Sequence, residues 1–327
     1  MARHDPKASD RLRKVHIRSG EFTTDPGVCC QDAWLVQSPA TMPDDVTNSP
    51  TWDQRLLRNP HAAPDKRSRV QRMFAAIAPS YDLNNRLHSL WMDQYWRRVA
   101  VRLAMLTASD RVVDVACGTG DLALRFAREL RVLNVGHDTH TLSANSLPHP
   151  VVGVDFTYEM LPLAGQKTPS IRVCDSDPDG SPDVTAQPNL WVNGDALGLP
   201  LADASADVVS IAFGIRNVTD PAAAIREFAR VLGPGGRLVI LEFSLPNDPL
   251  LRRLYNFYFR KVLPFTATLI SHDRTGAYKY LPESVNTFVG RDEMANMMRE
   301  AGFVDLRRRV LTLGVCVCYV GVAPARG

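Results

Sequence analysis

A short turn of two glycines and a threonine is the stretch of this sequence best suited to hold a ligand with its backbone. Gly118, Thr119 and Gly120 directly follow the apolar, β-branched residues 112–115, which favour a buried parallel strand. Apolar residues then recur at helical spacing over 122–130, so the turn joins the carboxyl end of a strand to the amino end of a helix. Open α/β sheets bind ligands at that position, and the turn therefore favours a nucleotide-like cofactor.

The spacing of these glycines limits the kinds of cofactor that the turn can bind. The third glycine of a dinucleotide fingerprint is missing, and no Lys-Ser or Lys-Thr pair completes the turn as a phosphate loop requires. Pyrophosphate binding and a dehydrogenase are therefore disfavoured. For this motif taken alone, a tight connection between strand and helix without any ligand remains an alternative.

Acidic residues at the ends of the next two strands strengthen the interpretation as a ligand site. Asp155 ends a strand expected over 151–155, where a carboxylate can accept hydrogen bonds from both hydroxyls of a ribose. Asp195 and Ala196 end a strand expected over 190–195, where a carboxylate and a small residue suit the amino group of an adenine. Together these positions predict a nucleoside site along the carboxyl edge of a sheet.

The periodicity of the chain predicts the scaffold that positions these residues. Further strands are expected over 207–213 and 237–243, and helices separate the five strands, which predicts an α/β fold with a doubly wound, mostly parallel sheet. Two closing strands, over 303–310 and 312–322, bring the expected total to seven. The helical residues 69–106 are rich in aromatic residues and suit a lid over the pocket, with helices packed on the sheet edge as the alternative.

Three segments differ in composition from this scaffold. Residues 1–67 predict a disordered or poorly ordered N-terminal extension, because prolines and acidic residues interrupt any lasting period. A mitochondrial transit peptide is an alternative for its basic start, which nevertheless contains acidic residues that such peptides usually avoid. Insertions are expected near 131–150 and 168–188, within a folded domain expected over 68–327.

Composition limits the classes of function. A net charge of +3 with 22% charged residues gives no case for nucleic acid binding. The six cysteines form no Cys-x-x-Cys pair, so a cytoplasmic protein without a structural metal is expected. No apolar run reaches the roughly 18 residues of a membrane span. Residues 248–263 alternate aromatic and basic residues in an amphipathic helix, which suits either core packing or peripheral membrane contact.

The motifs as a set resemble the class I S-adenosylmethionine-dependent methyltransferases. The residues that carry this resemblance are Asp114 with the glycine turn of 118–120, Asp155, Asp195 with Ala196, and the Pro-Gly-Gly of 234–236. The resemblance implies a Rossmann-like class I methyltransferase fold with an N-terminal helical lid, and S-adenosylmethionine as the cofactor.

Within that class the chain is similar to the ubiquinone/menaquinone biosynthesis C-methyltransferase family. The similarity rests on Tyr-Asp-x-x-Asn over 81–85 and on the runs 212–220 and 230–244, and it extends over 69–322. The chain departs from the family pattern outside the expected cofactor positions, at Asn84, Asp93, Gly233 and Leu313.

This resemblance implies roles for individual residues. The residues implied for cofactor binding are Gly118, Thr119, Gly120, Asp155, Asp195, Ala196 and Ala212. The residues implied for catalysis are Arg216 and Asn217, followed by Tyr81 and Asp82. An arginine beside the pocket can stabilise a phenolate, whose charge makes the neighbouring ring carbon nucleophilic, or hold a water that takes the proton. The alternative is that Arg216 only pairs with a carboxylate of a loop.

The implied reaction is the methylation of a ring carbon of a polyprenylated quinol in respiratory quinone biosynthesis. Demethylmenaquinol is the preferred substrate. Two alternative substrates stay open, 2-methoxy-6-polyprenyl-1,4-benzoquinol and another lipid-like phenol or sterol. A further alternative is that the protein is a non-catalytic subunit of a quinone-synthesis complex. Contact with the inner face of the cell membrane would be peripheral. A homodimer and a quinone-synthesis complex are both compatible with the motifs.

Overall fold

Seven strands form one sheet in the computed structural model, which describes residues 51–134, 150–168, 189–271 and 275–324. The strand order is β3-β2-β1-β4-β5-β7-β6. Neighbouring strands from β1 to β5 are parallel, whereas β7 runs antiparallel between β5 and β6. The strands are β1 (Val112–Val115), β2 (Val152–Asp155), β3 (Leu190–Asn193), β4 (Ala206–Ala212), β5 (Leu232–Phe243), β6 (Val304–Leu311) and β7 (Cys316–Val322).

The centre of the sheet is buried on both faces because β1 and β4 are rich in β-branched residues. Val115 pairs with Ile211 across these two strands. Asp114 and Ser210 are buried polar residues of these strands, and Asp114 Oδ1 accepts a hydrogen bond from Ser210 Oγ at 2.6 Å. Burial raises the pKa of Asp114 to about 7.

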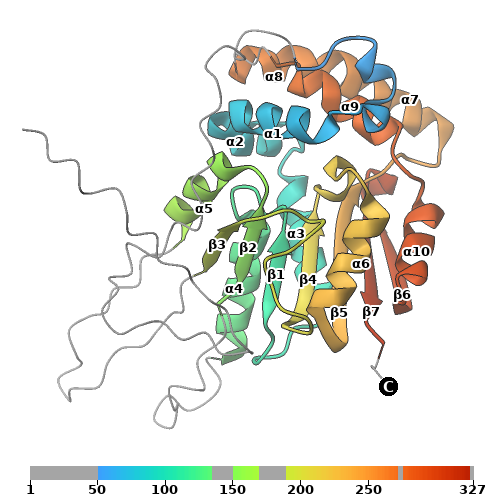
Figure 1. Ribbon diagram of the computed structural model, residues 1–327. Coiled ribbons are helices and arrows are strands. Elements are labelled where there is room, and N and C mark those ends of the chain that lie inside the picture. Colours follow the sequence, from blue (N-terminus) through green and yellow to red (C-terminus); the bar gives the residue numbers. More distant parts are fainter. Residues whose placement is uncertain (1–50, 135–149, 169–188, 272–274, 325–327) are drawn as a thin grey trace, which may run out of the picture.

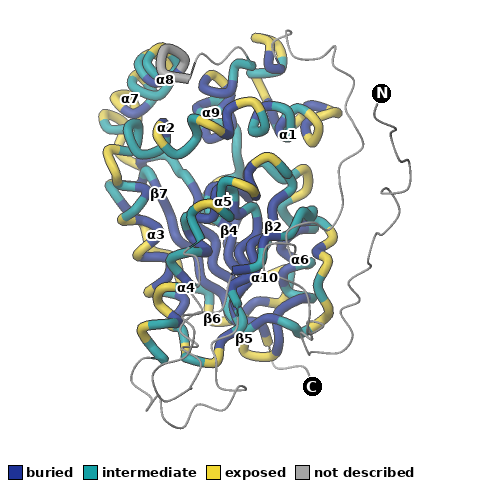
Figure 2. The backbone as a smooth tube through the Cα atoms, turned by 90° about the vertical axis from the view of Figure 1, so that its left-hand side faces the viewer, coloured by how far each residue is buried: buried dark blue, intermediate teal, exposed yellow. Residues whose placement is uncertain are grey.

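Helices cover both faces of the sheet, as the expected doubly wound fold requires (Figure 1). Apolar side chains of α3 (Met92–Leu103), α4 (Asp121–Asn134) and α5 (Leu161–Lys167) pack on one face. Those of α6 (Pro221–Val231) and α10 (Arg291–Glu300) pack on the other face. The buried strands between the two helical layers are visible in Figure 2.

A further layer of helices lies over the carboxyl ends of the strands, at the top of Figure 1. Its buried side chains form a separate apolar cluster. The layer contains the short 3-10 turns η2 (Leu56–Arg58) and η3 (Pro60–Ala62), α1 (Lys66–Ile77), α2 (Tyr81–His88), α7 (Pro249–Phe257), the π-helical η9 (Tyr258–Val262), α8 (Leu263–Ser271) and α9 (Ala277–Asn286). The expected lid is therefore confirmed for the part of residues 69–106 that forms α1 and α2, whereas α3 packs on the sheet, as the alternative expected.

Residues 51–67 are part of the described fold, although the sequence placed the start of the folded domain at residue 68. Trp52 is 3% exposed, and its ring stacks on Tyr280 with 4.5 Å between the centroids. The expectation of disorder over 1–67 was therefore wrong for residues 51–67, because Trp52 packs on α9 and the buried Lys66 bonds the carbonyls of Arg216 and Val218. Residues 1–50 lie outside the described residues.

Other boundaries also differ from the expected ones. α4 runs to Asn134, into the insertion expected near 131–150, and residues 135–149 and 169–188 of the two insertions lie outside the described residues. β5 begins at Leu232 instead of residue 237. Within the described ranges, no helix is long and apolar enough to cross a membrane.

Candidate active site

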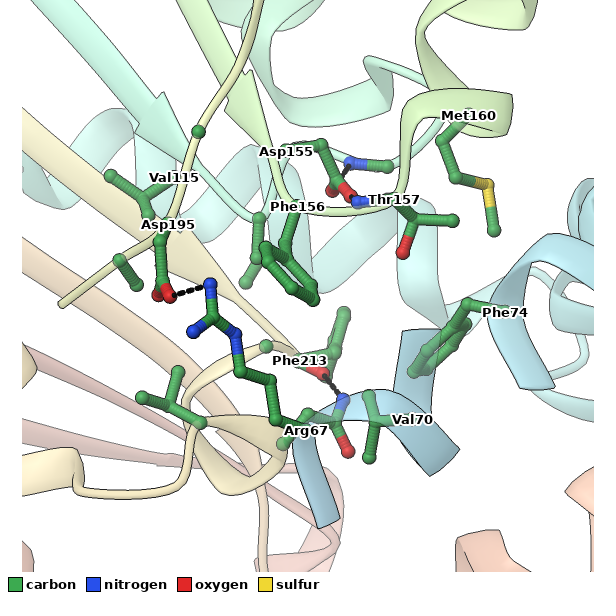
Figure 3. A pocket seen from close by; sticks show the side chains of 18 of the residues that line it. Arg67, Val70, Phe74, Val115, Asp155, Phe156, Thr157, Met160, Asp195 and Phe213 are labelled. Atoms are coloured by element: carbon green, nitrogen blue, oxygen red, sulfur yellow. Dashed lines mark hydrogen bonds and ion pairs between the residues drawn. The ribbon is translucent and has the colours of Figure 1, made fainter. Parts of the chain in front are cut away.

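A cavity lies between the carboxyl ends of the strands and the lid layer. It measures about 820 Å³ when the space open to solvent is counted, and Figure 3 shows the side chains around it. The lining residues include seven that the sequence predicts for function: Gly118, Asp155, Asp195, Ala196 and Ala212 on the cofactor side, with Asn217 and Tyr81 among the catalytic candidates. The fold thus brings together residues from β1, β2, β3, β4 and the lid.

The glycine turn has the backbone conformation that glycine favours. Gly118 has a φ of +55° and Gly120 a φ of +81°. A Cβ on Gly118 would come no closer than 3.9 Å to a side chain, that of Tyr81, so this glycine leaves the backbone open to a ligand in the cavity. A Cβ on Gly120 would lie 2.5 Å from the Trp191 ring, so this glycine is required for packing.

Asp155 lies at the end of β2 with its carboxylate oriented by the backbone. Its Oδ2 accepts a hydrogen bond from the Gly118 amide at 2.7 Å, and its Oδ1 accepts one from the Thr157 amide at 2.7 Å. Each oxygen keeps a second lone pair for a ligand hydroxyl. Burial raises the pKa of Asp155 to about 6, so the carboxylate is ionised at neutral pH.

Asp195 contacts a residue that the sequence did not single out. Its Oδ1 accepts a hydrogen bond from the Leu197 amide at 3.0 Å, while its Oδ2 lies 2.8 Å from Nη2 of Arg67 on α1. The Arg67 guanidinium also lies over the Phe156 ring, 4.6 Å from its centroid (Figure 3). The expected adenine position therefore holds a side chain of the lid.

Backbone strain occurs where the central strands end at the cavity. Ala116 has a φ of +51° and Phe213 a φ of +58°, in the left-handed region that non-glycine residues rarely adopt. Both residues line the cavity. Such conformations are concentrated at functional sites, where the surrounding structure compensates their cost.

Arg216, the first catalytic candidate, lies beside the cavity but not on its wall. Its side chain is 3% exposed, and Nη1 contacts Glu242 Oε1 of β5 at 2.7 Å and the Phe213 carbonyl at 2.6 Å. Nε donates to Ser284 Oγ at 3.3 Å. This guanidinium is therefore engaged by groups of the protein, and its described contacts fix the loop that follows β4.

Asn217 and Tyr81 line the cavity directly. The Tyr280 hydroxyl donates a hydrogen bond to Asn217 Oδ1 at 2.9 Å, and Asn217 Nδ2 lies 3.4 Å from the Phe213 carbonyl, which fixes the orientation of the amide. Desolvation by burial raises the pKa of Tyr81, so its hydroxyl keeps its proton at neutral pH. Both side chains can therefore donate hydrogen bonds in the cavity.

Asp82 and Thr119 belong to a polar network beside the cavity. Thr119 Oγ1 donates to Asp82 Oδ1 at 2.6 Å, which connects the glycine turn to α2. Lys167 forms ion pairs with Asp82 and, at 2.7 Å, with Asp121 Oδ1. These contacts tie the lid to the turn, and they engage both oxygens of the Asp82 carboxylate.

Lys66 on α1 is a buried cation of the site that sequence reasoning missed. Its Nζ donates to the carbonyls of Arg216 at 2.9 Å and Val218 at 2.7 Å, and to His61 Nδ1 at 3.1 Å. Burial lowers the pKa of Lys66 to about 8. A lysine at the start of an ordinary amphipathic helix carries no signal in the sequence for such a role.

The topology and the site together define the class of protein. A parallel sheet with one reversed strand between its fifth and sixth strands, a glycine turn after β1 and carboxylates at the ends of β2 and β3 define a class I S-adenosylmethionine-dependent methyltransferase. The chain matches the model of the ubiE/COQ5 methyltransferase family over residues 63–323, and it belongs to this family.

Curated relatives agree with this assignment. A ubiquinone/menaquinone biosynthesis C-methyltransferase of Geobacter sp. (strain M21) is 41% identical over 261 residues, which cover 80% of this chain and 99% of that protein. A demethylmenaquinone methyltransferase of Deinococcus radiodurans is 42% identical over 257 residues, covering 79% of this chain and 93% of that protein. A demethylmenaquinone methyltransferase of Thermus thermophilus is 41% identical over 252 residues, which cover 77% of this chain and 100% of that protein.

The residues present fit S-adenosylmethionine. The open backbone at Gly118 suits the methionine end, and the lone pairs of Asp155 suit the two ribose hydroxyls. Asp195 and the Phe156 ring offer a hydrogen-bond acceptor and a stacking surface for a purine. Among the described residues, no group of three or more His, Cys, Asp or Glu side chains could hold a metal ion.

Proposed function

We propose that this methyltransferase transfers a methyl group from S-adenosylmethionine to a ring carbon of a polyprenylated quinol, with demethylmenaquinol as the preferred substrate. The observation that supports this most is one cavity whose lining combines two kinds of residue. The carboxylates Asp155 and Asp195 line it together with the aromatic Phe74 and Phe213 and the hydrogen-bonding Asn217. The carboxylates suit a nucleoside, and the aromatic and amide groups suit an aromatic ring with hydroxyl groups.

The cofactor side uses the residues at the ends of the parallel strands. Asp155 accepts hydrogen bonds from the ribose, and Asp195 with Ala196 receives the adenine. The open backbone at Gly118 faces the methionine end, Gly120 completes the turn, and Ala212 at the end of β4 also lines the cavity. When bound, S-adenosylmethionine supplies an electrophilic methyl group on a sulfonium.

On the quinol side, the residues promote ionisation of a ring hydroxyl. A neutral ring carbon is a weak nucleophile, whereas a phenolate places electron density on the ortho carbon that receives the methyl group. Tyr81 keeps its proton and can donate a hydrogen bond to the phenolate oxygen, and the amide of Asn217 is held in position for the same contact. The hydroxyl proton passes to water from the open side of the cavity. Transfer of the methyl group breaks its bond to sulfur and leaves a neutral thioether, and the neutral dienone formed on the ring then loses the proton of its methylated carbon to water and regains one on its oxygen, so aromaticity returns.

For Arg216 we propose a positioning role. Its ion pair with Glu242 and its bond to the Phe213 carbonyl hold the strained end of β4. Lys66 holds the same loop from the lid side through the Arg216 and Val218 carbonyls. The two cations thereby keep Asn217 at the cavity.

We also propose that the outer face of the lid contacts a membrane surface, where a polyprenyl tail resides. Leu250, Leu254 and Phe257 are 58–66% exposed and lie on one face of α7, at spacings of four and three residues. Arg252 and Arg253 of the same helix are exposed and suit anionic lipid headgroups. This face would place the cavity beside the bilayer.

Methyl transfer from labelled S-adenosylmethionine to reduced demethylmenaquinone and to the methoxy-benzoquinol tests the reaction. We expect product from demethylmenaquinol and a loss of at least about tenfold in kcat for Asn217→Ala, the scale of one transition-state hydrogen bond, with affinity for S-adenosylhomocysteine unchanged. Asn286→Ala is the matched control, because Asn286 bonds the Pro282 carbonyl in α9, away from the cavity. If the protein binds S-adenosylhomocysteine but forms no product from either quinol, the proposal is contradicted.

Cosedimentation with liposomes tests the membrane surface. We expect binding to vesicles containing anionic lipid at low salt, and Leu254→Glu should weaken it. Val132→Glu is the control, because Val132 is 63% exposed near the end of α4, a helix that packs on the sheet and not in the lid layer. Equal binding of the two variants would assign the interaction to another surface.

A further inference from the structure

Arg67 makes two contacts in the cavity that differ in kind. Its Nη2 lies 2.8 Å from Asp195 Oδ2, and its guanidinium carbon lies 4.6 Å from the centroid of the Phe156 ring. Figure 3 shows the guanidinium beside both side chains, reaching across from α1 to the end of β3. The planar group therefore donates a hydrogen bond to a carboxylate while it lies over an aromatic ring.

An adenine at this position would make the same two contacts. Its exocyclic amino group is a donor for the Asp195 carboxylate, and its flat ring system stacks on an aromatic face such as that of Phe156. A guanidinium is also planar, carries N–H donors at its edge and stacks on aromatic rings. The two groups are thus chemical equivalents for this pair of side chains.

We propose that Arg67 competes with the adenine of the cofactor for Asp195 and Phe156, and so sets the affinity and rate of cofactor binding. This inference rests on the proposed placement of the nucleoside at these residues. Arg67 must leave the cavity when the nucleoside enters, and it returns when the nucleoside leaves. The residue is thereby a determinant of cofactor exchange that belongs to the lid.

The surroundings of Arg67 allow its side chain to move without its helix. The preceding residue, Lys66, is 2% exposed and anchored to two carbonyls of the loop after β4, which fixes the start of α1. The Arg67 side chain is 59% exposed, so solvent can receive the guanidinium when it leaves. An exposed ion pair and one cation–π contact are each weak, so a nucleoside can displace them.

Titration with S-adenosylhomocysteine tests the competition. Calorimetry measures the affinity, and stopped-flow fluorescence measures the association rate. We expect Arg67→Ala to bind about three- to tenfold more tightly than wild type, the range of an exposed ion pair with a cation–π contact. Arg72→Ala is the matched control, because Arg72 lies on the same helix, carries the same charge and does not line the cavity. Its affinity should equal that of wild type.

Two further measurements identify the adenine as the competing group. Adenosine alone should show the same gain in Arg67→Ala, since the methionine end takes no part. Raising the salt from about 50 to 500 mM should bring wild-type affinity toward that of Arg67→Ala, because screening weakens the Arg67–Asp195 pair.

The outcomes separate this inference from the proposed function. Unchanged or weaker binding by Arg67→Ala overturns the competition, and weaker binding would show that Arg67 closes over the bound nucleoside. Absence of binding by both wild type and Arg67→Ala would contradict the nucleoside site itself, and with it both proposals.

Discussion

The buried ion pair between Arg216 and Glu242 gives the sharpest test of how the site is held. Both side chains are 3% exposed, and their charged atoms lie 2.7 Å apart. Glu242→Gln keeps the shape of the side chain but removes the negative charge. The guanidinium then remains buried with only neutral acceptors, the Phe213 carbonyl and Ser284 Oγ.

The expected cost follows from this burial. Removing one partner of a buried pair leaves an uncompensated charge, and we expect Glu242→Gln to lower the free energy of unfolding by about 3–5 kcal/mol. Replacing both members, as in Arg216→Met with Glu242→Met, removes the stranded charge and should cost much less. The control is Glu283→Gln, whose partner Arg260 is 46% exposed, and here the loss should stay below about 1 kcal/mol.

Urea denaturation followed by circular dichroism measures these changes. With an m-value of about 3 kcal/mol per molar, the midpoint of Glu242→Gln should fall by about 1–1.7 M. If the midpoint of Glu242→Gln falls no further than that of Glu283→Gln, the pair does not hold the loop and the positioning role of Arg216 is refuted. The methylation activity of the double variant, Arg216→Met with Glu242→Met, distinguishes a positioning role of Arg216 from direct contact with the quinol. Activity well above that of Arg216→Met alone supports positioning. If both variants are equally inactive, direct contact is supported.

Three further predictions follow from the site and its surroundings. Gly120→Ala should lower the free energy of unfolding by about 2–4 kcal/mol, because its Cβ would lie 2.5 Å from the Trp191 ring at a φ of +81°. Gly235→Ala is the control for backbone strain alone in the same urea assay, because Gly235 has a φ of +74° and open space around it. Affinity for S-adenosylhomocysteine should fall about tenfold per pH unit below about 6, because Asp155 has a pKa raised to about 6 and a protonated carboxyl accepts hydrogen bonds poorly; a flat pH profile from 4.5 to 7 would contradict this. Because burial lowers the pKa of Lys66 to about 8, the unfolded chain binds the proton more tightly above that pH. The unfolding free energy of wild type should therefore rise relative to Lys66→Met by about 1.4 kcal/mol per pH unit between pH 8 and 10, and equal slopes in urea titrations would refute the burial of this ammonium.

The sequence by itself determined the scaffold and the residues on the side of the cavity where we propose that the cofactor binds. The strands and most helices could be predicted because periodic burial is a local property of the chain, and Gly118, Asp155 and Asp195 could be placed because parallel strands end at one edge of the sheet. Arg216 was predicted to stabilise a phenolate from beside the pocket. It lies beside the cavity, but its guanidinium contacts Glu242 of β5, a partner for which the sequence carries no local signal. Periodicity predicts which face of its own helix or strand a side chain lies on, but not which charged residue of another element it contacts.

Only the tertiary structure decided what the lid contributes. Trp52, Lys66 and Arg67 lie in a stretch whose composition predicts disorder, yet the first is buried, the second anchors the loop after β4 and the third enters the cavity. Each of these contacts spans more than a hundred residues of chain. Such pairings arise from the packing of α1 and its preceding turns over the sheet, and that packing is a property of the whole fold, because no local pattern records which distant residues meet.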